Sequence, residues 1–357
     1  MSPPDGQPRA DEAFANLPDG QPRPGEAFAG PPDGPTGPGE ASEGLALLRE
    51  RCGKVIEDLL SYLDASSGPV LPGSTPLIAT GIGGSEGPAR LLALLLQRRG
   101  AAARFVPLSS FATEAPPGRS LVVFSQGLSP NAALALTRRG RYEEALLVTG
   151  LAPGDEALPV GPGEALFLPG GEERGLLVRL RGPALAMAAA MRLAGAVAPE
   201  AARLREALER AAEHGRGLGP LPPGPLALLA AGEYAGACEG LRWRLLEGLL
   251  RPDVVLWDTL SVAHGPFQGF YEGAQTLVAL EQGATAVLSE RLGAMLRPGR
   301  HALLRLPSTL EEPWCLLEHL VQLDALMVAT LERTPRRLCP WPGQGEDGPL
   351  YRLGQDC

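Results

Sequence analysis

The chain has 357 residues, of which 44% are hydrophobic, so it is long enough to bury the cores of two compact domains. Its 32 basic residues are outnumbered by 41 acidic ones, and this net charge of −9 argues against a nucleic-acid partner, which needs a basic face. The five cysteines show no Cys-x-x-Cys spacing and are expected to be free thiols in the reducing cytoplasm.

Residues 1–42 form a repetitive N-terminal segment, in which Pro-Asp-Gly recurs from Pro4, Pro18 and Pro32. A segment rich in proline and glycine buries too little apolar surface to offset the entropy lost on ordering. We therefore expect residues 1–42 to be a disordered tail. No membrane segment is expected either, because the most apolar stretch, residues 184–198, is interrupted by Arg192, whereas a span needs about 20 apolar residues.

From Gly44 onward, apolar residues recur at three- and four-residue steps, which predicts a helix. Short apolar runs then alternate with helical segments. The runs expected to be strands are 76–80, 104–108, 120–124, 145–148 and 165–168, and the expected helices are 89–98, 130–139 and 182–198, the last continuing through 212. This alternation predicts a doubly wound parallel α/β sheet of the flavodoxin type in a first domain, residues 43–214.

The second half repeats this plan after a linker rich in glycine and proline at residues 215–225. Expected strands are 225–231, 253–257, 276–280 and 302–306, and expected helices are 234–250 and 313–332. The sequence thus predicts a second doubly wound domain in tandem, residues 226–340, followed by a C-terminal tail, residues 341–357.

Two short loops with serines follow strands of the first domain: Gly81-Ile82-Gly83-Gly84-Ser85 and Ser125-Gln126-Gly127-Leu128-Ser129. The carboxyl ends of neighbouring parallel strands meet at one crevice, where helix N-termini offer free N–H groups to an anion. Glycines let the backbone approach a ligand, and serines add neutral donors. The pair predicts a cradle for a small phosphorylated metabolite, made by Gly83, Ser85, Ser125, Gln126 and Ser129.

A dinucleotide site is the alternative interpretation of Gly81-x-Gly83. It needs a third glycine where this chain has Glu86, and an acidic residue after the next strand, where the chain has Val106-Pro107-Leu108. Because both requirements fail, no cofactor is expected. No pair of the four histidines has a metal-ligand spacing, so no metal is expected.

Four motifs in this order resemble the tandem SIS (sugar isomerase) family, in particular the isomerase half of glutamine:fructose-6-phosphate amidotransferase and related fructosamine deglycases. Besides the two loops, they are Ala263-His264-Gly265-Pro266 and Pro335-Arg336-Arg337-Leu338, and the resemblance covers roughly residues 45–340. It implies a homodimer with shared active sites that binds a sugar phosphate. It also implies proton transfer between adjacent carbons of the open-chain sugar.

The resemblance further implies roles for three residues. Glu247 stands at the family's interval after Gly232 and would be the catalytic base; the alternative is an exposed glutamate paired with Arg244 or Arg251. His264 would open the sugar ring in the neighbouring subunit's site. Glu173 lies in a segment similar to the family's Glu-x-Gly and would contact the substrate.

Two classes of function remain open. The first is a phosphosugar isomerase or deglycase-like enzyme, without the glutaminase domain, since only the tail precedes the first domain. The second is a non-catalytic sugar-phosphate sensor. The sensor is favoured by Cys339-Pro340 after the fourth motif, where the family's isomerase has a lysine; the enzyme is favoured by Glu247 and His264.

Overall fold

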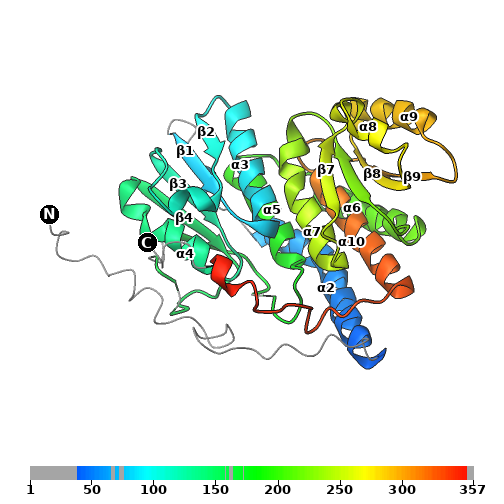
Figure 1. Cartoon of the computed structure of the whole chain (residues 1–357). Helices are drawn as coiled ribbons and strands as arrows, with labels where there is room; N and C mark the ends of the chain where they lie inside the picture. The colour runs from blue at the N-terminus through cyan, green and yellow to red at the C-terminus, as the bar shows by residue number, and fades with distance from the viewer. Residues whose placement is uncertain are drawn as a thin grey trace.

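The computed structural model describes residues 38–65, 69–71, 76–156, 158–160, 164–171 and 173–351. Helix α2 (Pro38–Ala65) begins inside the segment expected to be a tail, and the expected disorder of residues 1–37 falls outside the described residues. Two parallel sheets lie side by side with several helices between them (Figure 1).

The first sheet has five strands in the order β2-β1-β3-β4-β5, and all its pairs are parallel. This is the strand order of flavodoxin-like sheets, the type of sheet that the sequence predicts for the first domain. The strands are β1 (Leu77–Thr80), β2 (Ala103–Phe105), β3 (Ser120–Phe124), β4 (Glu144–Thr149) and β5 (Ala165–Phe167). Strand β2 ends earlier than predicted, because Pro107 has no N–H for the ladder and the turn η2 (Leu108–Phe111) follows it.

Alternate side chains of β1 enter two different cores, as a doubly wound sheet requires. Leu77 and Ala79 pack with helices α3 (Glu86–Arg98) and α5 (Arg181–Leu193). Ile78 packs on the opposite face with α4 (Pro130–Thr137). Because both faces are covered, the strands are apolar throughout and could be recognised as buried runs in the sequence.

The second sheet has the order β7-β6-β8-β9 and is also entirely parallel. Its strands are β6 (Leu226–Ala230), β7 (Val254–Asp258), β8 (Gln275–Glu281) and β9 (His301–Pro307), and its outer helices are α8 (Pro266–Gly269) and α9 (Ala286–Met295). The helix predicted over residues 234–250 is divided into the turn η5 (Glu233–Cys238) and helix α7 (Glu239–Leu249). Helix α9 had no counterpart among the predicted elements.

One apolar core joins the two halves. It contains Leu48 of α2, Leu91 of α3, Leu228 of β6 and Leu317 of α10 (Cys315–Arg333). Helix α6 (Ala201–Gly217) packs on α10 and extends into the predicted linker, and Gly195, at a φ of +73°, separates it from α5. Within the described residues, no helix combines the length and the apolar character needed to cross a membrane.

Candidate functional site

The loop after β1, residues 81–85, turns sharply into α3. It contains the single turn η1 (Gly83–Ser85), in which the Ser85 N–H donates to the Ile82 carbonyl at 3.1 Å. A Cβ on Gly81 would collide with the Ser85 carbonyl, and Gly83 has a φ of +58°. Glycine is therefore required at both positions for this turn.

The loop after β3, residues 125–129, is held by its own serines. The Ser125 hydroxyl accepts from the Ser129 N–H at 3.1 Å, and the Ser129 hydroxyl accepts from the Ala132 N–H at 3.3 Å, capping α4. Because β1 and β3 are neighbours, the two loops meet at the same edge of the sheet. This edge is also the point where the strand order reverses, which is where open α/β sheets bind ligands.

Gln126 fills the space between this second loop and the start of α5. A Cβ on Gly182 would collide with its side-chain amide, and a Cβ on Gly150 would lie 3.0 Å from its Oε1. Its Nε2 is buried and has no hydrogen-bond partner among the described residues. The absence of side chains at the two glycines thus leaves room for the amide, and its Nε2 remains available as a hydrogen-bond donor.

Glu247 reaches the first loop from the other half of the chain. Helix α7 packs on η1, and Oε1 of Glu247 lies 3.4 Å from the position that a Cβ on Gly83 would occupy. Burial raises the pKa of Glu247 to about 7, although Arg179 and Arg244 act in the opposite direction. A carboxyl group with this pKa exchanges protons readily at neutral pH.

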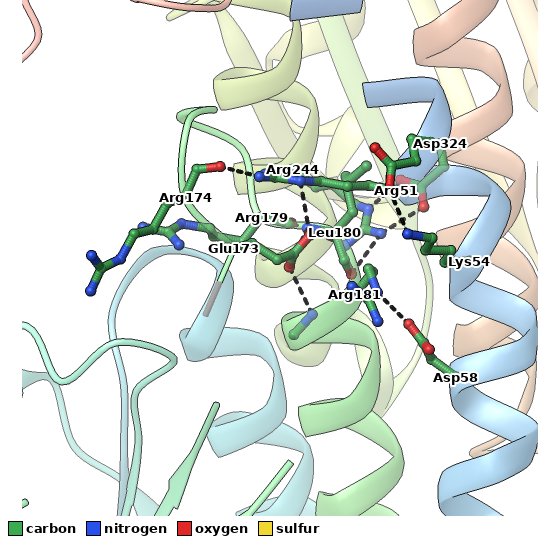
Figure 2. A network of polar contacts seen from close by, with 12 residues as sticks. Arg51, Lys54, Asp58, Glu173, Arg174, Arg179, Leu180, Arg181, Arg244 and Asp324 are labelled. Carbon is green, nitrogen blue, oxygen red and sulfur yellow. Dashed lines mark hydrogen bonds and ion pairs between the residues drawn. The ribbon is translucent and has the colours of Figure 1, made fainter. Parts of the chain in front are cut away.

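Arg244, one turn before Glu247, pairs with Asp324 and not with Glu247. Its Nε donates to Oδ1 and its NH2 to Oδ2 of Asp324, the latter at 2.6 Å, and NH2 also donates to the Leu180 carbonyl at 3.0 Å (Figure 2). Both side chains of the pair are buried. The ion pair connects α7, α10 and the segment before α5, so it fixes the helix that carries Glu247.

Glu173 belongs to the same buried network (Figure 2). Its Oε2 accepts from the N–H groups of Leu180 at 3.0 Å and Gly182 at 2.8 Å, and Arg51 of α2 lies 3.9 Å from Oε1. The carboxylate therefore caps the start of α5, which packs Pro183 against Gly84 of the first loop. Direct contact between Glu173 and a substrate stays a prediction.

His264 is exposed, between the turn η6 (Leu260–Ala263) and α8, beyond the edge strand β7. Its backbone N–H donates to the Ser261 carbonyl at 2.9 Å. Within the part of the chain that the structure describes, His264 and Glu247 form no hydrogen bond or ion pair with each other, so the two predicted catalytic residues are not paired within one chain.

The partners of this network were not identified from the sequence. Arg51 lies at helical spacing from the buried Leu48 and Val55 of α2, and Asp324 lies within the mainly apolar α10. Those positions were the available signal, since a charge on a buried face needs a partner. Trp243 and Glu86, which contact each other beside the first loop, were also missed as site residues. Within the described residues, no cluster of His, Cys, Asp and Glu side chains could hold a metal ion.

No family model matches the sequence, and no curated protein matches it. Solved structures do resemble the chain. A glucosamine-6-phosphate deaminase from Thermotoga maritima has a TM-score of 0.61 at 16% identity, covering 84% of this chain and 96% of that one. The C-terminal domain of the glucosamine-fructose-6-phosphate aminotransferase from Francisella tularensis has a TM-score of 0.59 at 11% identity, covering 80% and 95%.

A tagatose-6-phosphate ketose/aldose isomerase from Escherichia coli has a TM-score of 0.57 at 13% identity, covering 85% of this chain and 96% of that one. All three resemblances extend over both halves of the chain. At these identities they establish the fold, and the α/β fold with two parallel sheets that the sequence predicted is confirmed.

Proposed function

We propose that this protein binds a phosphorylated sugar or amino sugar at the loops after β1 and β3, and that it catalyses aldose–ketose isomerisation or deglycase-like chemistry. In this proposal the protein acts as a cytoplasmic homodimer. Glu247 transfers a proton between adjacent carbons of the open-chain sugar.

The position and pKa of Glu247 are the observation that carries the proposal. A general base works best when its pKa lies near the working pH, and burial raises the pKa of Glu247 to about 7. Its carboxylate faces Gly83, in the loop that would bind the sugar. The group is therefore able to accept a proton from one carbon and return it to the next.

Neutral donors would hold the phosphate. The hydroxyl oxygens of Ser125 and Ser129 accept backbone N–H groups, which leaves their hydroxyl protons to donate to an anion. Ser85 and the Nε2 of Gln126 would add two further donors. Glu173, by capping α5, would keep Gly182 and Pro183 against the two loops.

His264 would act in the partner's site in this proposal. Its exposed position permits a second copy of the chain to approach it. An imidazolium can donate a proton to the ring oxygen and so help the sugar open.

Solvent deuterium exchange tests the proposal. We expect the protein to incorporate deuterium from D2O into fructose 6-phosphate or glucosamine 6-phosphate, at the carbon next to the carbonyl, as measured by mass spectrometry. The Glu247→Gln variant should bind the sugar and incorporate none. Tight binding by the wild type with no incorporation across neutral pH would overturn catalysis. It would instead support the sensor, which the absence of a lysine at Cys339-Pro340 favours.

A further inference from the structure

Arg244 and Glu247 are neighbours on α7 that do not pair with each other. They stand three residues apart, a spacing that places two side chains on the same side of a helix, where an arginine and a glutamate can form an ion pair. The Arg244 guanidinium instead binds Asp324 of α10 through Nε and NH2, with NH2 2.6 Å from Oδ2. The cation that α7 places beside Glu247 is thus bound by a different carboxylate.

The remaining bonds of Arg244 hold its guanidinium in this direction. NH2 also donates to the Leu180 carbonyl at 3.0 Å, and NH1 donates to the Arg179 carbonyl at 3.4 Å (Figure 2). A guanidinium is planar and rigid, so bonds from all three of its nitrogens fix the orientation of the whole group. Arg244 could turn towards Glu247 only by giving up Asp324.

Close packing of α7 on α10 brings the ion pair together. Gly248 follows Glu247 directly, and a Cβ at this position would overlap the sulfur of Met327, which lies one turn after Asp324 on α10. The two helices therefore approach each other closely at the ion pair. Arg244 and Asp324 are each only 3% exposed, and in such a site the choice of partner for a charge has a larger effect than in water.

Two cations act on Glu247, and both favour its ionised form: Arg179, from the segment before α5, and Arg244. The first loop, residues 81–85, carries no charged side chain. The titratable groups that act on Arg244 come from three other elements and are Asp324, Glu173 and Cys52. Burial raises the pKa of Glu247 to about 7 against the two cations. An Arg244 released by Asp324 would favour the ionised form of Glu247 more strongly.

We infer that Asp324 is a positioning residue for Glu247: by binding Nε and NH2 of Arg244, it keeps this cation from pairing with the Glu247 carboxylate. Glu247 is thereby able to take up and release a proton near neutral pH, and it does not become the permanently ionised partner of an arginine. The importance of this control for a sugar reaction rests on the proposed function. The ionisation of Glu247 can be measured without a sugar.

NMR of the protein with carbon-labelled glutamate side chains tests the inference. The signal of Glu247 is the one that Glu247→Gln lacks. Asp324→Asn keeps the size of the side chain and removes its charge, and we expect it to lower the midpoint of the Glu247 titration by about one pH unit. Asp253→Asn is the matched control, because Asp253 also binds Nε and NH2 of an arginine, Arg251, which lies beyond the end of α7. This control should leave the midpoint unchanged.

The double variant Arg244→Gln/Asp324→Asn separates the charge of Arg244 from the packing around it. With both charges removed, the midpoint should return to the wild-type value or exceed it, since Arg244 favours the ionised form of Glu247. If Asp324→Asn only admitted water to the site, the midpoint would stay low in the double variant. An unchanged midpoint in Asp324→Asn would overturn the inference, and so would a midpoint below that of the wild type in the double variant. The second criterion applies even if Asp324→Asn does not fold.

The proposed function fails by a different result. If the wild type incorporates deuterium, Asp324→Asn should move the pH profile of incorporation by the same amount as the titration. The expected titration shifts without any incorporation by the wild type would overturn the proposed catalysis and leave the role of Asp324 intact. Incorporation by the wild type with no shift in Asp324→Asn would overturn the role of Asp324 alone.

Discussion

The carboxylate of Glu247 faces the backbone of Gly83 across the boundary between the two halves of the chain, with Oε1 3.4 Å from the position of a Cβ on residue 83. Glycine meets two requirements at position 83, because it permits the φ of +58° and leaves room for the carboxylate. The first sheet supplies the loop and the second half supplies the acid, so neither half contains this pair alone.

The exchange reaction should depend on pH through Glu247. The carboxyl must be ionised to accept a proton, and its pKa is raised to about 7 by burial. We expect the rate of deuterium incorporation to rise between about pH 6 and pH 8 and then level off. Glu239→Gln, on the same helix and paired with Arg242, should leave the profile unchanged. A rate that is flat from pH 5 to pH 8 would exclude Glu247 as the base.

The same pKa predicts a stability effect. A carboxyl whose pKa is higher in the folded state than in the unfolded state binds its proton more tightly in the folded state. Its contribution to the free energy of unfolding is fully present below the unfolded pKa, and it is lost as the pH rises through about 7. Glu247→Gln has no charge to bury. Urea unfolding should therefore find the variant about 1–3 kcal/mol more stable than the wild type at pH 8, with the difference shrinking towards pH 4.5. Equal stability at pH 8 would contradict the raised pKa.

Ser125→Ala should weaken binding of a phosphorylated sugar by about 1–2 kcal/mol, because one hydroxyl donor is removed and the Ser129 N–H loses its acceptor. The fold should remain intact. Ser109→Ala, at an exposed position of the turn η2, provides the control with the same chemical change. Calorimetric titration of the two variants measures the difference, and unchanged affinity in Ser125→Ala would place the anion elsewhere.

Breaking the buried ion pair of Arg244 and Asp324 should lower the free energy of unfolding more than breaking an exposed ion pair. Asp324→Ala leaves a buried guanidinium without its partner, and we expect it to lower the free energy of unfolding by about 3–5 kcal/mol. The exposed pair of Arg119 and Glu143 is the control, and Glu143→Ala should cost less than about 1 kcal/mol. The double variant Arg244→Leu/Asp324→Leu should recover most of the stability. Urea unfolding measures the free energy of unfolding of each variant. A small loss of that free energy in Asp324→Ala would show that water reaches Arg244.

His264 should act between subunits. His264→Ala should slow reactions that start from the closed ring more than those that start from an open-chain analogue. If the two residues serve one site from different chains, mixing inactive Glu247→Gln and His264→Ala proteins should restore part of the activity in heterodimers. No recovery after mixed subunits have been shown to form would rule out a shared site.

The order of the elements and the two loops could be predicted from the sequence because their signals are local. Strands such as β3, covered on both faces, appear as continuous apolar runs, and Gly81 and Gly83 mark the turn that follows β1. Helix ends were less certain. The start of α2 and the division of the segment predicted as one helix into η5 and α7 depend on packing against neighbours that a local pattern does not contain.

The tertiary structure decided which charged side chains meet. Arg244 and Asp324 are 80 positions apart in the sequence, and they pair because α7 and α10 pack together. The packing of α7 on α3 and η1 sets Trp243 against Glu86 and Glu247 against Gly83. The physical reason is that the pKa and the partner of an ionisable group depend on how the surrounding elements exclude water from it, and spacing along the chain does not specify that environment.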